Sequence, residues 1–169
     1  MANKKPAATP PAQPVPIGDT RMVMERLMLP TDANVYGNVH GGHIMKYIDE
    51  AAGIVAHRHA RTNIVTASID RMDFYEPVFI GNVLILKAAL NYTGSTSMEI
   101  GVRVEAEDMD TGHVTHTGSC HLVYVALGKN GKPVPIRPVE PGNDDERRWY
   151  EHAKRRREER LRSRATPRA

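Results

Sequence analysis

One helical pattern constrains this chain more than any other feature of its sequence, because it is apolar over most of its circumference. From residue 42 to about residue 58, apolar side chains recur on one face at spacings of four, three and four: Ile44, Ile48, Ala51 and Val55. Further apolar side chains widen this face: Met45, Tyr47, Ala52, Ile54 and Ala56. A helix of this kind needs cover on most sides, and we expect a curved sheet to wrap it.

The remaining patterns supply the strands of such a sheet. A short apolar run at residues 21–29 ends at Pro30 and favours a strand. Four longer strands are expected after the helix: residues 64–75, 83–92, 97–107 and 114–127. Their connections are short, which favours antiparallel neighbours. The sequence therefore predicts an α+β fold in which an antiparallel sheet surrounds one buried helix.

The first of these four strands changes its apolar phase part way along. Val65, Ala67 and Ile69 share one face, whereas Met72 follows in the opposite phase. A slip of one residue indicates a β-bulge, which we place near residues 70–71.

The two ends of the chain differ from this central domain, which we place at residues 19–140. Residues 1–18 are rich in Ala and Pro and are expected to be disordered. Residues 141–169 are expected to form a basic terminal helix or tail. Its last 24 residues hold ten Lys or Arg against four Glu, although the whole chain carries only +3. The rest of the chain is therefore mildly acidic.

The terminal helix is expected to begin after a cap at Asn143 or Asp144, with Trp149 and Tyr150 as its apolar anchors. Its acidic residues stand at helical spacing from its basic residues. This favours a solvated, salt-bridged helix over an arm that binds nucleic acid.

Cysteine usage and hydropathy indicate the compartment. The single cysteine, Cys120, excludes an intrachain disulfide and favours a reducing environment. Prolines rather than an apolar run follow Lys4 and Lys5, and no window approaches the ~20 apolar residues of a membrane helix. We expect a soluble, cytoplasmic protein that does not contact membranes.

Asp49 is the first candidate for chemistry. Helical spacing places it between the polar stripe and an apolar flank, and partial desolvation makes a carboxylate the stronger base that general-base catalysis requires. The alternative is an ion pair with Lys46. Lys46 can equally pair with Glu50, which would leave Asp49 free.

The start of the helix is the second candidate. Backbone amides after Gly41 and Gly42 carry positive potential and can hold a developing oxyanion. The alternative is an ordinary tight turn. Asn38 could orient a water molecule, or could stabilise the loop as an Asx turn.

Metal and nucleophile sites are less well supported by the pattern. His40 and His43 stand three residues apart, without further ligands at a supporting spacing. Cys120 and His121 are neighbours on a strand and should face opposite ways. The sequence has neither a nucleophile-elbow motif nor a phosphate-binding glycine loop.

Four short motifs of the central domain occur together in one known family: Gly37–Gly42, Ile48–Gly53, Thr62–Ser68 and Gly94–Ile100. They resemble the hot-dog-fold acyl-CoA thioesterases, in particular the brain-type cytosolic acyl-CoA hydrolases and their single-domain bacterial relatives. The resemblance covers about residues 20–140 and continues weakly into the terminal helix.

The resemblance implies a helix wrapped by an antiparallel sheet, and two such units paired edge to edge. Each active site then lies at the dimer interface, built from Asn38 of one subunit and Asp49 of the other. Relatives often assemble further, as trimers of dimers.

The implied activity is hydrolysis of an acyl-CoA to a fatty acid and CoA, with no metal and no cofactor beyond the CoA of the substrate. Asp49 acts as general base, or alternatively as a nucleophile through an anhydride. Asn38 orients the water or the thioester, and the amide of Gly42 or His43 stabilises the oxyanion. Six further residues are expected to contact the substrate: His40, Gly41, Arg58, Arg61, Thr96 and Ser97.

Two alternatives stay open. One is a non-catalytic hot-dog module that senses acyl-CoA, although the presence of both Asn38 and Asp49 favours catalysis. The other is a hot-dog dehydratase with His40 as its base.

Overall fold

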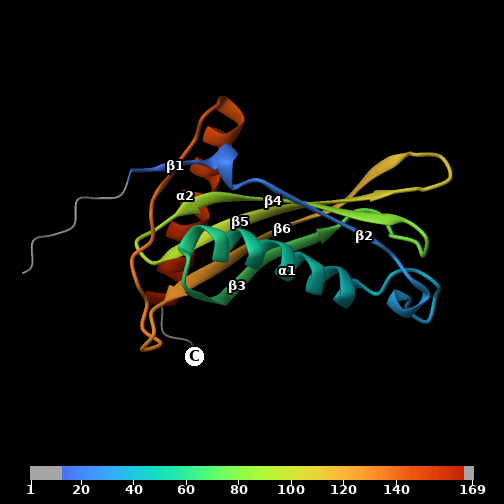
Figure 1. Ribbon diagram of the computed structural model, residues 1–169, viewed down its shortest axis with the longest axis horizontal. Helices are drawn as coiled ribbons and strands as arrows, with labels where there is room; N and C mark the ends of the chain where they lie inside the picture. Colours follow the sequence, from blue (N-terminus) through green and yellow to red (C-terminus); the bar gives the residue numbers. More distant parts are fainter. Residues whose placement is uncertain (1–12, 166–169) are drawn as a thin grey trace, which may run out of the picture.

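The computed structural model describes residues 13–165, which form a curved five-stranded sheet with a helix against each side (Figure 1) and a separate parallel pair of two-residue strands. The expected disorder of residues 1–12 lies outside the described residues. The elements are, in order, β1 (Val15–Pro16), η1 (Ile17–Thr20), β2 (Met22–Leu27), η2 (Pro30–Asp32), α1 (Gly41–Ala60), β3 (Asn63–Phe74), β4 (Val83–Thr93), β5 (Ser97–Glu107), β6 (Val114–Leu127), β7 (Val139–Glu140) and α2 (Asp144–Ala165).

Five strands form the main sheet in the order β2-β4-β5-β6-β3, and every neighbouring pair is antiparallel. The helix α1 crosses one face and contacts all five strands. The predicted α+β architecture is confirmed. The short connection between β3 and β4 does not make these strands neighbours, because β3 crosses to the far edge and pairs with β6.

The face of α1 that the periodicity predicts is the buried one. Ile44, Ile48, Ala51 and Val55 are each at most 4% exposed. Met45 and Ile54, however, are each 39% exposed, so the chain's own sheet covers only one side of the helix. Met45 and Ile54 are nine residues apart and therefore lie on opposite flanks of the buried face, where a single curved sheet does not cover them.

β3 contains the predicted bulge and a second one. Register shifts occur between Ile69 and Arg71, as expected, and also between Thr66 and Ser68. The second shift makes the prediction of one shared face for Val65 and Ile69 wrong. Val65 pairs with Val125 and Ile69 pairs with Leu122, an odd number of residues apart on β6.

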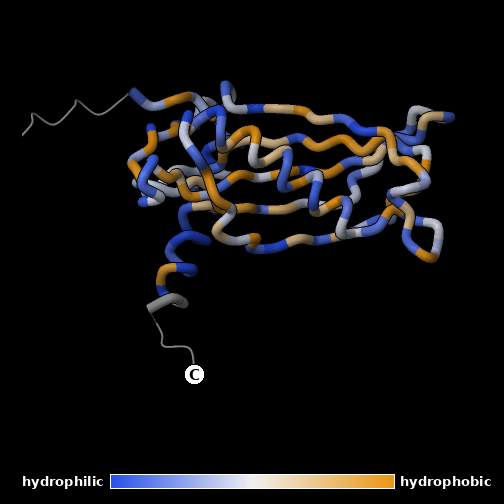
Figure 2. The backbone as a smooth tube through the Cα atoms, turned by 60° about the horizontal axis from the view of Figure 1, so that its bottom comes forward, coloured by the Kyte–Doolittle hydropathy of each residue, from blue (hydrophilic) through white to orange (hydrophobic). Residues whose placement is uncertain are grey.

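α2 is anchored differently from the prediction. The Asn143 side chain caps it by accepting the Glu146 N–H at 2.9 Å. Arg156 and Arg160 reach back to Glu99 of β5, which is 1% exposed. The helix is polar along most of its length (Figure 2), yet ion pairs to the sheet hold it. Ion pairs at the predicted helical spacing occur in the first turns, between Arg147 and Asp144 and between Arg148 and Asp145. Arg156 and Arg160, however, meet acids on distant strands, which spacing along the helix could not predict.

Two smaller expectations also need correction. Of the two expected anchors of α2, Tyr150 packs partly buried against the core, whereas Trp149 is 40% exposed and Ala153 is fully buried instead. The predicted disorder up to residue 18 ends too late, because Ile17 is fully buried in the core. Val15 and Ile17 alternate with prolines, and two apolar side chains are too few for a periodic signal. No helix within residues 13–165 is both long and apolar enough to span a membrane.

Candidate active site

The loop between β2 and α1 is held against the helix by the buried carboxylate of Asp32. Its Oδ2 accepts the Leu29 N–H at 2.9 Å, and its Oδ1 accepts the Tyr47 hydroxyl at 2.7 Å. The Leu29 N–H is the main reason that the pKa of Asp32 lies below its ordinary value. His43 Nδ1 lies 3.2 Å from the same carboxylate. The loop therefore enters α1 along a fixed path.

His40 caps the N-terminus of α1. Its Nδ1 accepts the Gly42 N–H at 2.9 Å, and its carbonyl oxygen accepts the His43 N–H at 2.9 Å. Both amides expected to face an oxyanion are thus engaged by His40. A Cβ at Gly42 would lie 3.0 Å from His40 Nδ1, so glycine lets the ring fold over the helix start.

Two asparagines of the loop lie beside the helix start. Asn34 Oδ1 accepts the Tyr36 N–H at 2.8 Å and the Asn38 N–H at 3.2 Å, which fixes the turn. Its side-chain NH₂ has no hydrogen-bond partner within residues 13–165. Asn34, Asn38 and Gly41 line a cavity of ≈ 280 Å³, and Phe74 at the end of β3 lies on the same cavity.

Asp49 lies on α1 where the helix faces β3 and β6. Its Oδ1 accepts the Tyr124 hydroxyl at 2.7 Å and the Thr66 hydroxyl at 3.0 Å. Oδ2 has no hydrogen-bond partner among the residues that the structure describes. Lys46 forms its ion pair with Glu50, at 3.8 Å, and not with Asp49. The arrangement orients one carboxylate oxygen and leaves the other available.

Tyr124 is a residue that the sequence interpretation missed. Burial, followed by the hydrogen bond to Asp49, raises the pKa of the Tyr124 phenol, so it stays protonated and donates. Thr66 lay within one of the quoted motifs but was not singled out. No local spacing links either residue to Asp49, because strand pairing brings them together.

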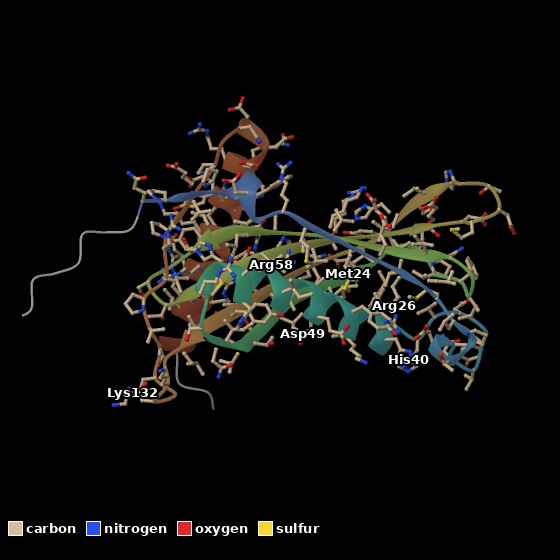
Figure 3. All side chains as sticks on the ribbon, in the orientation of Figure 1. Met24, Arg26, His40, Asp49, Arg58 and Lys132 are labelled. Atoms are coloured by element: carbon tan, nitrogen blue, oxygen red, sulfur yellow. The ribbon has the colours of Figure 1, made fainter. Side chains whose placement is uncertain are left out.

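The other expected substrate-binding residues lie at the opposite end of the sheet. His40 and Arg58 mark the two ends of α1, with Asp49 between them (Figure 3). Arg61 follows α1 in the left-handed conformation with φ 53°, near the turn that carries Thr96 and Ser97. One chain therefore does not bring these groups to the loop with the two asparagines.

The remaining nucleophile and metal candidates are not built for those roles. Burial raises the pKa of the Cys120 thiol to about 11, so it is protonated at neutral pH. His121 follows it on the opposite face of β6. Within residues 13–165, no group of three or more His, Cys, Asp or Glu side chains could hold a metal ion.

Comparisons with known proteins agree with this geometry. Residues 36–113 match the model of the thioesterase superfamily. Protein VdlD of Helicobacter pylori is 40% identical over 143 residues, which are 85% of this chain and 82% of VdlD. The cytosolic acyl coenzyme A thioester hydrolase of rat is 37% identical over 144 residues, which are 84% of this chain but only 38% of that protein.

Solved structures match over almost the whole chain. An apo-hexameric acyl-CoA thioesterase superimposes with a TM-score of 0.87 at 41% identity, covering 93% of this chain and 100% of the other. The acyl-CoA hydrolase of Staphylococcus aureus, solved with butyryl coenzyme A and coenzyme A, superimposes with a TM-score of 0.82 at 33% identity. The match covers 89% of this chain and 92% of the hydrolase. The resemblance expected from the four motifs is thus confirmed, and this chain belongs to the thioesterase superfamily.

Proposed function

We propose that this protein hydrolyses acyl-CoA thioesters at sites that two copies of the chain build together. The observation that carries the proposal is the Asp49 carboxylate on the central helix. Two hydroxyl donors orient its Oδ1, and its Oδ2 is free to take a proton from water. A general base needs this combination of fixed orientation and one open acceptor.

The Staphylococcus aureus hydrolase supports the choice of residues. It has been solved as single alanine variants of an asparagine, an aspartate and a threonine. Its asparagine precedes the aspartate by 15 residues, and its threonine follows the aspartate by 17. In this chain, Asn34, Asp49 and Thr66 have the same residue types at the same two spacings.

This spacing favours Asn34 over Asn38 as the amide of the site. The Asn34 carbonyl is held by two backbone N–H groups, so its NH₂ group has a fixed direction without a partner of its own. A pre-oriented donor stabilises developing negative charge at little reorganisation cost. Asn38 lines the same cavity but makes no side-chain hydrogen bond with the described residues.

The distance along α1 argues for two copies. Asp49 is seven residues beyond Gly42, or about 10 Å along the helix axis at 1.5 Å per residue. A base and an oxyanion donor for one carbonyl must both lie within about 3 Å of the reacting atoms. Groups of one chain therefore serve different sites, and a second chain must complete each.

The edge strand β3 offers the surface for this pairing. It is 12 residues long and forms one edge of the sheet, and its Val65 and Ile69 are each 41% exposed. A long edge with exposed apolar side chains is a template for pairing with another strand. Two-fold pairing along β3 would bring the far end of the partner, with its Arg58, Arg61, Thr96 and Ser97, toward the asparagine loop. Relatives described as hexameric support a trimer of such dimers.

The reaction proceeds through attack of water on the thioester carbonyl carbon. Asp49 takes a proton from the water as the new C–O bond forms, and the carbonyl oxygen becomes an oxyanion. The Asn34 NH₂ group donates to this oxygen, and the Gly42 N–H joins it when the His40 ring turns away. The C–S bond then breaks, and the proton held by Asp49 passes to the CoA sulfur. Attack by Asp49 itself, through an anhydride, is the variant mechanism.

Release of free thiol from a panel of acyl-CoA substrates tests the proposal. We expect turnover by the wild type, and a loss of about 10²-fold or more in Asp49→Ala and in Asn34→Ala. Glu50→Ala is the matched control, because Glu50 is an exposed carboxylate on the next position of α1.

Other outcomes contradict parts of the proposal. A wild type that binds CoA esters without turnover would identify a sensor of acyl-CoA. Full activity in Asp49→Ala would refute the base assignment. If Asn38→Ala loses activity while Asn34→Ala keeps full activity, Asn38 and not Asn34 donates to the oxyanion.

A further inference from the structure

A second cavity lies on the face of the sheet that is opposite to α1. It has a volume of ≈ 470 Å³ and extends over β4, β5 and β6 as far as the start of α2. Space is left over its floor because Ala89 has only a methyl group and Gly101 has no side chain. This volume falls within the range of sites that enclose small organic molecules. The cavity is separate from the asparagine loop and from Asp49.

One end of the cavity contains an amide whose polar groups are unused. Asn91 is 6% exposed, and its side chain has no hydrogen-bond partner within residues 13–165. It stands at the register shift between Leu90 and Tyr92, and such a bulge re-aims a side chain. A Cβ at Gly101 would lie 2.6 Å from Asn91 Nδ2, so glycine lets the amide lie along the cavity floor.

The Asn91 amide reaches the open space of the cavity, where it can pair with water or with a ligand. A ligand that displaces this water must offer a hydrogen bond of its own, because a polar group left without a partner destabilises the complex. The neighbouring His121 adds a neutral hydrogen-bonding group, because burial lowers its pKa to about 4. This end of the cavity therefore suits an uncharged polar group such as a hydroxyl.

The other end carries positive charge. Lys87 and Arg103 both pair with Glu105, at 2.6 Å each, and Glu105 is 7% exposed. Two cations share one carboxylate, which leaves a net charge of one at this end. Lys87 precedes Asn91 by four residues on β4, or about 13 Å at 3.3 Å per residue. Between the two ends the cavity is lined by apolar surface from Met22 and Val23.

We propose that this cavity binds an apolar carboxylate with a second, hydrogen-bonding group near its far end, such as a medium-chain hydroxy acid. The carboxylate meets Lys87 and Arg103, the chain lies along the apolar floor, and the hydroxyl pairs with Asn91. Carboxylates of this class are also products of thioester hydrolysis, so a role in product feedback rests on the proposed function. The binding itself does not.

Trp149 makes the site directly observable. It is the single tryptophan of the chain, it lines the cavity, and its ring lies 6.0 Å from the Arg21 guanidinium carbon. We expect a saturable change in tryptophan emission when decanoate or 10-hydroxydecanoate is added to the full chain, and no such change with decanol or CoA. The hydroxy acid should bind about three- to tenfold more tightly than decanoate, because it adds one hydrogen bond.

Substitutions at the two ends separate binding from structure. Asn91→Leu should abolish the preference for the hydroxy acid while Tm changes little, since the amide makes no hydrogen bond with the described residues. Lys87→Met should lower the affinity for decanoate and for 10-hydroxydecanoate about two- to fivefold. Lys129→Met, in the exposed turn after β6, is the control for Lys87→Met and should leave both affinities unchanged. Ala89→Leu fills the floor and should block both ligands.

Three results would overturn the proposal. They are equal binding of decanol and decanoate, no saturable change with either acid, and an unchanged preference in Asn91→Leu. Thiol release by the same preparations is measured in parallel. If the protein hydrolyses acyl-CoA but the acids do not change its tryptophan emission, the proposed ligand site is refuted and the proposed function stands. If the acids bind but no acyl-CoA is hydrolysed, the proposed function is refuted and the ligand site stands.

Discussion

Complementation between two inactive variants is the most direct test of the shared site. One chain carries Asn34→Ala and the other carries Asp49→Ala. In a mixed dimer, the site that draws Asn34 from the first chain and Asp49 from the second has lost both groups. The other site draws both groups from unaltered positions. Mixing therefore restores intact sites only if the two residues act across the interface.

The expected recovery follows from the symmetry of the pair. Random association at equal concentrations gives half mixed dimers, and each mixed dimer has one intact site out of two. Activity should therefore return to about a quarter of the wild-type value. The starting level is far lower, because removal of a general base alone costs about 10²- to 10⁴-fold.

The assay is thiol release from acyl-CoA by the two chains co-expressed at equal levels and purified through a tag that both carry, so that every combination of chains is kept. Each variant purified alone supplies the baseline, and two copies of Asp49→Ala co-expressed in the same way are the control for handling. Recovery of about a quarter of the wild-type activity supports a site shared between chains, as inferred from the separation of about 10 Å between Gly42 and Asp49 along α1. If the mixed protein is as inactive as its parents, each site is built within one chain, and the reasoning from helix geometry fails.

Three further perturbations have defined outcomes. Tyr124→Phe removes a hydroxyl that orients Asp49 Oδ1, so kcat in the thiol-release assay should fall while Tm changes little, and an unchanged kcat would show that Thr66 alone orients the carboxylate. Glu99→Gln leaves Arg156 without its carboxylate and should lower the free energy of unfolding by about 2 kcal/mol, measured in urea; an unchanged value would show that α2 docks without this pair. Asp32→Asn should destabilise the chain at pH 7. Because its folded pKa lies below the ordinary 3.8, the difference from wild type should persist above that pH and vanish as pH falls through the folded value, and a constant difference would contradict this.

Periodicity predicted the elements of this fold because their faces are sharply divided. β5 begins and ends at the predicted residues 97 and 107, and β6 at residues 114 and 127. The turn between them contains Gly112 at φ 70°, a conformation that glycine adopts readily. Local patterns of this kind need no knowledge of tertiary packing.

Contacts between segments that are far apart in the sequence could not be predicted from local periodicity. Asp49 was singled out from its position on a helix, but its donor Tyr124 lies 75 residues away. Arg156 was assigned to a solvated helix, yet its partner Glu99 lies 57 residues away on β5. The choice between Asn34 and Asn38 likewise depends on which amide a turn holds in place. In each case strand register and helix docking decide the outcome, and neither is encoded in a short window.

The exposed parts of this chain have one common explanation. Met45 lies on the open side of α1, and Ile69 lies on the edge strand β3, where apolar exposure would normally be selected against. Asp49 lies between these two elements, with one oxygen held by Thr66 of β3 and the other free. A second chain paired along β3 would cover the apolar side chains and bring its own asparagine loop toward that free oxygen. The same surface thus accounts for the incomplete cover of the helix and for the incomplete site, and the complementation experiment tests both at once.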